Sequence, residues 1–479
     1  MKTTRLKYAL LGSGAALAVI AASVPASASD IDEMRAQIQA LQDKIAKIEV
    51  QEQRRVAPAA AVEAGSKPKS WKLPGTNTSM NIGGFAILQF DYDINGASSY
   101  GPANAPVDGS AGSKRQGEFD LNARQSRIFV STSTPTDWGD LVTHIEFDMN
   151  GTGGQTVSQG AEYNSNQGAA LRMRKAYGSL GPVLAGQDTT TFFTPGAGER
   201  TDVATPFLGS SAFRLGVVRY THAFGGGTML QVALEDPVNS GDTAAAGSVF
   251  GANNANGRGL SAAQITSITG NLANVHPTPA FVAQLSHKWS SGEIGLSFMG
   301  RELKVDNAST AGGALNDSTA SWGLSLGSGV IISKQFRAGA QFLYGKSLGI
   351  YSGGESVLLT ASGPQGNFAI DNVGVVGGAA FLQWRFTDTM RANVLYGRED
   401  YSYDLSKAEL GIGTTGNSCA STTAASCAID YTQMIAANIM WEPVPAVNIG
   451  LQYLYTINSL INSPNAKQSR LELAFRYSF

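Results

Sequence analysis

Seven arginines of this chain lie in segments where apolar and polar residues alternate, a pattern that separates the two kinds of residue onto opposite faces of a β-strand. Each arginine falls in the polar set; Arg219, for example, lies between Val218 and Tyr220. The side chains predicted to occupy these polar faces are Arg127, Arg172, Arg174, Arg219, Arg301, Arg470 and Arg476, with His144, Glu146, Asp148 and Glu235. Guanidinium groups hold carboxylates through paired hydrogen bonds, so this set predicts a surface that attracts anions.

A second interpretation of the same arginines stays open. Each could pair with Glu146, Asp148, Glu235 or Glu472 and stiffen a wall without meeting any solute. The alternation also assigns neighbouring residues to a face. Ser131 is expected on the polar face with Arg127, whereas Leu171, Met173 and Tyr177 are expected on the apolar face of their segment.

Residues 190–213, between two such segments, form a connection that holds Phe192, Glu199, Arg200 and Asp202. If the segments form a wide barrel, a connection at this position is expected to fold inward and narrow the bore, and it is called the constriction loop below. Glu199, Arg200 and Asp202 would then face the arginines and set a transverse field. The alternative is an ordinary outside loop.

The elements that must position these residues are strands. The two-residue period recurs sixteen times, beginning at residue 78 and then near 121–133, 140–149, 170–180, 183–190, 214–223, 227–236, 280–289, 293–303, 320–332, 336–345, 375–386, 390–400, 430–442, 446–456 and 469–479. An arginine facing lipid near the bilayer midplane costs roughly 2–4 kcal/mol, which confines the arginines to the interior. The pattern predicts an all-β transmembrane fold, a 16-stranded antiparallel outer-membrane β-barrel spanning 78–479.

The connections between these segments alternate between short and long. Short ones include 135–139, 181–182 and 443–445, whereas long ones include 237–279 and 401–429. In outer-membrane barrels the short turns are periplasmic and the long loops face outside. A propeller or a β-solenoid would have more uniform connections and a motif in each repeat, and the sequence has neither.

The N-terminal part differs from the rest. Residues 1–28 have the basic head, apolar middle and Ala-x-Ala exit of a signal peptide. Residues 29–53 carry a heptad seam of Ile31, Met34, Ile38, Leu41, Ile45 and Ile48. Isoleucine occupies the a positions 31, 38 and 45, and the d positions mix isoleucine with leucine, which favours trimers over dimers, so a periplasmic coiled-coil helix is predicted. A lone amphipathic helix lying on the barrel or the membrane is the alternative. Residues 54–77 are expected to form a linker, flexible over Arg54–Ser70.

Composition narrows the possible functions. Charged residues make up 15% of the chain and its formal net charge is −2, which argues against a basic nucleic-acid binder. The only two cysteines, Cys419 and Cys427, are expected to form a local disulfide after export. Neither a metal site nor a cofactor is predicted.

An enzyme is not predicted either. Outer-membrane hydrolases need a serine, a histidine and an acid or amide in contact. The four histidines are His144, His222, His276 and His287. His144 shares a face with Glu146, but no serine is expected beside it. A hydrolase remains the weaker alternative, and a structural tether that uses the helix to bind periplasmic material is the other.

Several short motifs resemble the DcaP-like porins. They are the run Lys72–Ser79 leading into Ile82-Gly83-Gly84, the run Asn122–Arg127, the pair of runs Leu171–Gly178 and Leu184–Gln187, Tyr344-Gly345, and the last strand. The resemblance covers about 30–479. It implies a homotrimer of sixteen-stranded barrels with a periplasmic coiled coil that passes small anionic solutes, such as dicarboxylates. The expected surroundings are the lipid and lipopolysaccharide of the outer membrane.

Overall fold

The computed structural model describes residues 28–55, 62–95, 107–110, 113–114, 117–151, 170–196, 198–200, 208–209, 213–237, 249–250, 273–275, 277–306, 316–352, 357–362, 367–404, 429–461 and 464–479. The chain divides into two units, Met1–Glu63 and Ala64–Phe479. Asp202, His276, Cys419 and Cys427 lie outside the described residues, as does the predicted signal peptide except for Ala28.

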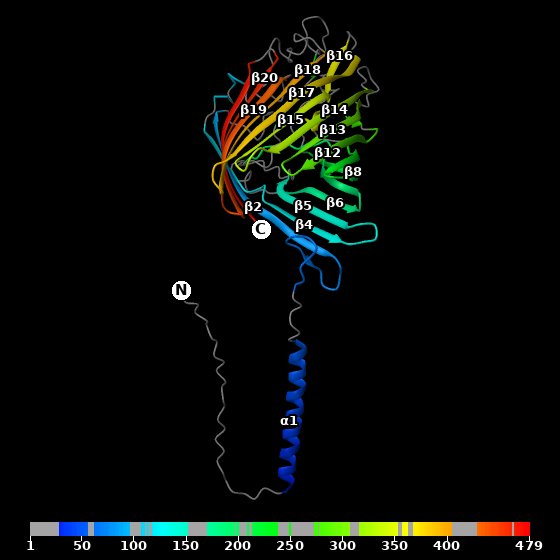
Figure 1. The fold of residues 1–479 in the computed structure, drawn as a ribbon, viewed down its shortest axis with the longest axis vertical. Helices are drawn as coiled ribbons and strands as arrows, with labels where there is room; N and C mark the ends of the chain where they lie inside the picture. Colours follow the sequence, from blue (N-terminus) through cyan, green and yellow to red (C-terminus); the bar gives the residue numbers. More distant parts are fainter. Residues whose placement is uncertain are drawn as a thin grey trace. The chain divides into compact units, whose positions relative to one another are not determined.

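The first unit contains one helix, α1 (Ala28–Arg55), drawn in Figure 1. It covers the segment in which the heptad seam predicts a helix. The seam residues Met34, Ile38, Leu41, Ile45 and Ile48 are all more than half exposed. Among the described helices, none is both long and apolar enough to span a membrane.

The second unit begins earlier than the predicted barrel. Strand β1 (Trp71–Lys72) pairs with the first wall strand, and Ala64 forms a bridge with Trp71. The backbone N–H of Gly65 donates to the carbonyl of Ser70 at 2.9 Å. Residues 64–70 of the predicted linker therefore close a hydrogen-bonded turn of their own.

Sixteen strands form the wall, as the alternating segments predict. They are β2 (Ser79–Asn95), β4 (Arg127–Thr134), β5 (Leu141–Gly151), β6 (Ala170–Leu180), β7 (Val183–Thr189), β8 (Arg214–Gly225), β9 (Thr228–Glu235), β12 (Ala280–Trp289), β13 (Gly292–Asp306), β14 (Asn316–Ile331), β15 (Phe336–Lys346), β17 (Asn367–Arg385), β18 (Met390–Tyr403), β19 (Ile429–Val444), β20 (Val447–Leu460) and β21 (Ala466–Ser478).

These strands close into a ring in which every neighbouring pair is antiparallel. The closure joins the last strand, β21, to both β20 and β2. Figure 1 shows the tilted strands of this wall. The closed ring satisfies the backbone of every wall strand, which a wall in lipid requires.

Four short strands lie outside the ring besides β1. They are β3 (Glu118–Asn122), β10 (Val249–Phe250), β11 (Ala273–Val275) and β16 (Val357–Ser362). The segment predicted as one strand over 121–133 is split into β3 and β4, because the 17-residue strand β2 pairs with both in turn. β17 likewise starts earlier than predicted, since its first residues pair with β16.

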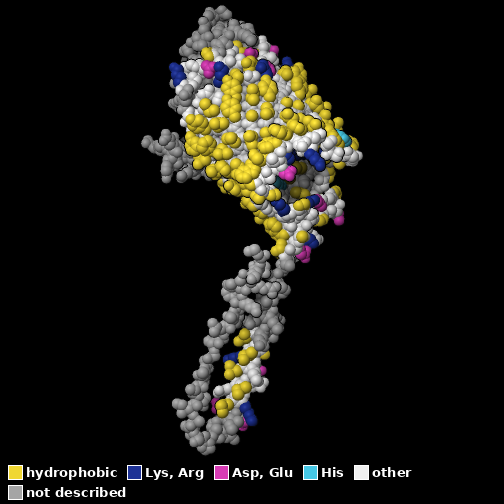
Figure 2. All heavy atoms as spheres, turned by 60° about the vertical axis from the view of Figure 1, so that its left-hand side comes forward, with side chains coloured by type: hydrophobic (Ala, Val, Ile, Leu, Met, Phe, Trp, Pro, Cys, Tyr) yellow, Lys and Arg dark blue, Asp and Glu magenta, His cyan; other side chains and the backbone are white. Residues whose placement is uncertain are grey.

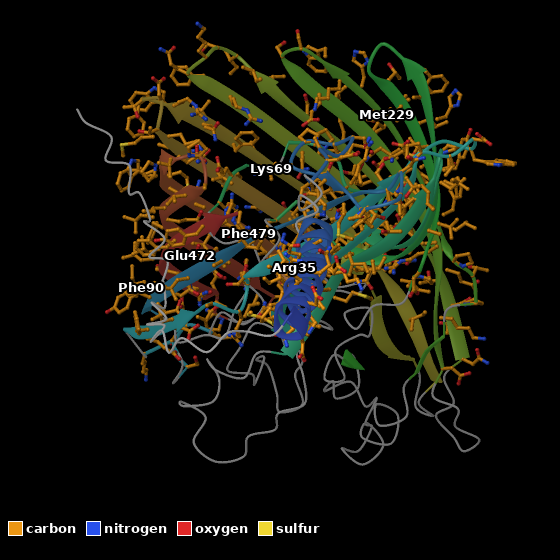
Figure 3. All side chains as sticks on the ribbon, turned by 90° about the horizontal axis from the view of Figure 1, so that it is seen from below. Arg35, Lys69, Phe90, Met229, Glu472 and Phe479 are labelled. Atoms are coloured by element: carbon orange, nitrogen blue, oxygen red, sulfur yellow. The ribbon has the colours of Figure 1, made fainter. Side chains whose placement is uncertain are left out.

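The outside of the barrel is apolar and the inside is polar. Neighbouring residues show the alternation: Leu296 is 49% exposed and Ser297 is fully buried, and Val394 is 57% exposed where Asn393 is 1% exposed. Figure 2 shows the hydrophobic side chains as a broad band over the barrel, beside an opening that has basic side chains at its edge. In Figure 3, seen from below, Phe90 lies at the outer edge of the ring. A band of this kind faces lipid.

The short connections, such as Gly181–Pro182 between β6 and β7, lie at one end of the barrel with the start of β2 and the end of β21. The strand ends that the longer connections join lie at the other end. The link between β20 and β21 covers only residues 461–465, which is shorter than predicted, because both strands extend further than their alternating segments.

Candidate functional site

An arginine-rich patch lies on the inner faces of β4, β5 and β6. Arg172 donates to both carboxylate oxygens of Asp148, at 2.8 and 2.6 Å. Arg174 donates to Glu146 at 2.7 Å and to Asp148 at 2.8 Å. Arg127 lies 3.5 Å from Glu146. Two carboxylates thus hold three guanidinium groups within one connected network.

A bulge in β6 builds this network. The register between β5 and β6 shifts between Glu146 and Phe147, so that Arg174 has no direct partner on β5. A bulge places two residues opposite one and redirects the side chains that follow. It explains why Arg172 and Arg174 both reach Asp148, and it reverses the faces of the residues after Arg174.

Tyr177 is the residue for which this reversal overturns the prediction. It was expected to face lipid, but it pairs directly with His144 across the strands, and the two rings stack at 5.3 Å. His144 also stacks on Phe129 at 5.5 Å. Three rings from three adjacent strands therefore line the inner wall beside the arginines.

A fourth arginine belongs to the same region. Arg214, the first residue of β8, lies within electrostatic range of Arg127, Arg172, Arg174 and Asp148. It forms no ion pair with a carboxylate of the described residues. We call Arg127, Arg172, Arg174 and Arg214, with Glu146 and Asp148, the arginine patch. Its four guanidinium groups face two carboxylates, so the patch carries two excess positive charges.

Arg219 lies close to the patch but has a different set of partners. It donates to Asp188 at 3.0 Å, to the hydroxyl of Thr191 at 2.9 Å and to the carbonyl of Thr189 at 2.6 Å. Lys175 completes this group with an ion pair to Asp188 at 2.7 Å. Arg219 therefore holds the start of the constriction loop against β8, which matches the interpretation of a wall brace.

The described part of the constriction loop runs along the inner wall. Gln284 on β12 donates to the carbonyls of Thr191 and Phe193 at 3.1 and 2.5 Å. Gln341 on β15 donates to the carbonyls of Thr194 and Pro195 at 2.5 and 3.2 Å. Both glutamines face inward, so residues 190–196 lie inside the barrel. Wall amides thereby satisfy a loop backbone that would otherwise be buried without partners.

Further along, the loop reaches the wall made by β17, β18 and β19. Glu199 forms an ion pair with Arg391 and accepts a hydrogen bond from Gln383 at 3.0 Å. Asn438 donates to the backbone carbonyl of Glu199 at 2.9 Å. Arg391 also lies 2.9 Å from Glu442. These two carboxylates around one guanidinium leave one excess negative charge.

Glu199 is paired with an arginine that the sequence did not single out, instead of with one of the predicted arginines. Around the ring of sixteen, β18 lies nearly opposite β5 and β6, and Glu199 contacts a different arginine, Arg391. Sequence alternation could not show this, because it assigns residues to the inner face without saying which strands lie across the bore. Arg200, the next residue of the constriction loop, is also engaged in an interaction.

The remaining predicted residues are dispersed over the wall. Arg470 forms paired hydrogen bonds with Asp93 at 2.7 and 3.0 Å. Arg476 and Arg127 both lie over the ring of Phe85, at 5.3 and 5.0 Å. Glu235 and Arg301 contact the inward-folded connections instead of the arginine patch. The seven predicted arginines thus do not form one cluster.

Several important residues were not predicted. Arg214, Arg391 and Glu442 sit near strand ends, where the alternation is weakest. The inward amides were also missed, although each lies between two apolar residues of its strand, which is a readable signal; they are Gln284, Gln341, Gln383, Asn393 and Asn438. Asn393 and Asn438 bond to each other at 2.7 Å and extend the row from Gln383 to Gln452.

The interior also contains a serine–histidine pair that was not expected. Ser131 and His144 are direct partners across β4 and β5, and Ser131 Oγ lies 2.6 Å from His144 Nδ1. The opposite nitrogen lies 3.9 Å from Glu146, beyond hydrogen-bond distance. Glu146 is instead held by Arg174, so a hydrolytic triad is not assembled. Within the described residues, no three potential metal ligands of the His, Cys, Asp and Glu types group together.

The comparisons with known proteins agree with this geometry. A family model described as the porin subfamily matches residues 71–472. The chain belongs to this porin family. Its barrel is accordingly an outer-membrane channel and not an enzyme, and the predicted family is confirmed.

A solved structure of a bacterial channel shows the same fold. The outer membrane channel DcaP of Acinetobacter baumannii matches with a TM-score of 0.62 and 19% identity, over 87% of this chain and 100% of that one. OmpT of Vibrio cholerae matches with a TM-score of 0.48 and 8% identity, over 84% of this chain and 98% of that one. An anion-selective porin from Comamonas acidovorans matches with a TM-score of 0.47 and 10% identity, over 84% of this chain and 100% of that one. The last two similarities are too low to carry an argument. No curated protein matches the chain.

Proposed function

We propose that this porin lets small hydrophilic solutes diffuse passively across the outer membrane and prefers anions, in particular small organic acids such as dicarboxylates. The observation that carries the proposal is the excess of two positive charges in the arginine patch. Guanidinium groups in a narrow bore raise the local concentration of carboxylates and hold them through paired hydrogen bonds.

Exposure distinguishes the arginines that would meet a solute. The side chains of Arg172 and Arg127 are 30% and 17% exposed, whereas those of Arg174 and Arg219 are 7% and 10% exposed. The first two therefore keep donors open to water. We assign contact with passing anions to Arg127 and Arg172, and support of the wall to Arg174 and Arg219.

The opposite wall supports a field across the bore. Glu199 and Glu442 around Arg391 carry one excess negative charge, and they lie across the ring from the patch. A solute between the two walls would be oriented with its carboxylates toward the arginines. The proposal therefore includes the predicted transverse field across the bore. Its negative side is formed by Glu199 and Glu442, which surround Arg391 on β18.

We further propose that three copies associate and that α1 lies in the periplasm. The exposed seam Met34–Ile48 would be covered by the helices of two other copies, as its isoleucine-rich pattern favours. The short turns lie at the barrel end where β2 begins, and short turns are periplasmic in such barrels. The apolar band would contact lipid and, on the outer side, lipopolysaccharide. Cys419 and Cys427 would close a disulfide within the connection between β18 and β19.

Solute uptake into liposomes tests the proposal. Vesicles that contain the purified protein would be exposed to succinate, to a neutral polyol of similar size and to a diamine of similar length. The proposal predicts faster entry of the dicarboxylate than of the other two. Equal rates for the three solutes would overturn the anion preference, and no entry of any solute would overturn the diffusion function.

A further inference from the structure

A second segment also lies inside the barrel. Residues 347–352, in the connection between β15 and β17, include a short helix, η2 (Gly349–Tyr351). Leu348 and Tyr351 are fully buried and Ile350 is 5% exposed. They pack against inward residues of the wall, among them Leu343 and Val375. A connection that only covered the rim would leave such side chains in water.

This segment packs directly on the constriction loop. The ring of Phe192, which is fully buried, meets that of Tyr351 edge to face at 5.5 Å. Gly323 on β14 marks how tight the packing is, since a Cβ added there would meet Leu348 at 2.4 Å and Phe192 at 3.1 Å. The two connections, distant in the sequence, therefore share one apolar core inside the bore.

Glu235, at the end of β9, joins the two connections by hydrogen bonds. One carboxylate oxygen accepts from the hydroxyls of Thr190 at 2.7 Å and Tyr351 at 3.0 Å, and the other accepts from the backbone N–H of Thr191 at 2.6 Å. The side chain is 1% exposed. A buried carboxylate is tolerated when its oxygens are satisfied, and such a network rigidifies what it connects.

Arg301, on β13, holds the second segment from its other side. One terminal nitrogen donates to the carbonyls of Ser347 and Leu348 at 3.3 and 3.1 Å, and the second donates to the carbonyl of Pro237 at 3.2 Å. The guanidinium lies 5.2 Å from the centre of the Tyr351 ring. Arg301 is 6% exposed, so its donors serve this segment and not a solute.

We propose that Glu235, Arg301 and Tyr351 are positioning residues for the constriction: they join residues 190–196 and 347–352 into one body that fills the bore beside β8 to β17. The solute path is then restricted to the part of the bore next to the arginine patch on β4, β5 and β6, because the constriction loop also contacts β18 and β19. This inference rests on the proposed function only in taking the bore to be the path of solutes. It implies that the width of the pore depends on two connections and not on one.

Replacing Tyr351 with phenylalanine tests the inference with minimal risk to folding. Y351F removes one hydroxyl and keeps the ring that packs on Phe192. Y396F is the matched control, because the Tyr396 hydroxyl also donates to a side chain of a neighbouring strand, Gln433, at 3.4 Å, but Tyr396 lies on the outer face of the barrel and is 43% exposed. Single-channel currents of both variants would be compared with the native protein in planar bilayers.

We expect Y351F to widen the bore intermittently and raise open-channel noise roughly twofold, with Y396F unchanged. E235Q is expected to have a larger effect, because an amide cannot accept from all three donors. The inference is overturned if Y351F keeps native conductance and noise. Anion preference is measured separately, from the reversal potential of the native protein, so a failure of the proposed function would be seen without affecting this comparison.

Discussion

Arg174 lies 2.8 Å from Asp148 although Arg172, two residues earlier on the same strand, already binds both oxygens of that carboxylate. The bulge in β6 makes this possible, since it removes Arg174 from regular pairing. One carboxylate thus orients two guanidinium groups, and the more exposed of them, Arg172, is left beside the bore. Arg174, which is buried, supports the wall, and Arg172, which is more exposed, contributes positive charge to the surface of the bore.

Neutralising the exposed pair Arg127 and Arg172 tests their assignment to solute contact. R127Q/R172Q removes both excess charges of the patch, and we expect the ratio of anion to cation permeability to fall by roughly twofold or more. The reversal potential in a salt gradient measures this ratio. R398Q is the control, because Arg398 shares the outward face of Val394 and Tyr396 and pairs with Asp400. A double variant that keeps the native ratio would show that these arginines only brace the wall.

Replacing Arg174 should affect stability more than selectivity. R174Q leaves Glu146 and Asp148 partly uncompensated at a buried position, and breaking such a pair costs about 3–5 kcal/mol. Unfolding in urea in detergent micelles measures the change. The cycle of R174Q, D148N and the double variant isolates the coupling between the two residues. Additive effects of the single substitutions would mean that the 2.8 Å ion pair contributes nothing of its own.

Glu199 and Glu442 form a natural pair of test and control on the opposite wall. Each pairs with Arg391, but only Glu199 belongs to the constriction loop. E199Q and E442Q both remove one negative charge, so both should increase anion preference in reversal-potential measurements. Only E199Q should also raise current noise, because it frees the loop from β18. Equal noise in the two variants would contradict an anchoring role for Glu199.

The exposed seam of α1 predicts a role in association. I38K/I45K places two lysines on the seam, whereas Q37K/K44Q changes neighbouring positions outside it. If three helices pack through the seam, the first variant should lower the thermal stability of the trimer in mild detergent, and the second should not. Native gels and light scattering measure the oligomer. If I38K/I45K leaves the thermal stability of the trimer unchanged, the helix does not stabilise the trimer through its seam.

The sequence predicted the wall better than the site. The two-residue period identifies sixteen strands, because every wall strand meets lipid on one side and polar groups on the other. That period says nothing about register, so it missed the direct pairing of Ser131 with His144. It also failed at Tyr177, where the bulge shifts the period by one residue. Glu199 was recognised as a loop acid, but its partner, Arg391, lies 192 residues away in the sequence.

The reversal potential of the native protein across a KCl gradient tests the central claim most directly. If the arginine patch sets selectivity, the potential should have the sign of chloride preference. It should weaken when the salt rises from about 0.1 M to 1 M, because the screening length falls from ~10 to ~3 Å. A potential of the opposite sign, or one close to zero at low salt, would contradict the account.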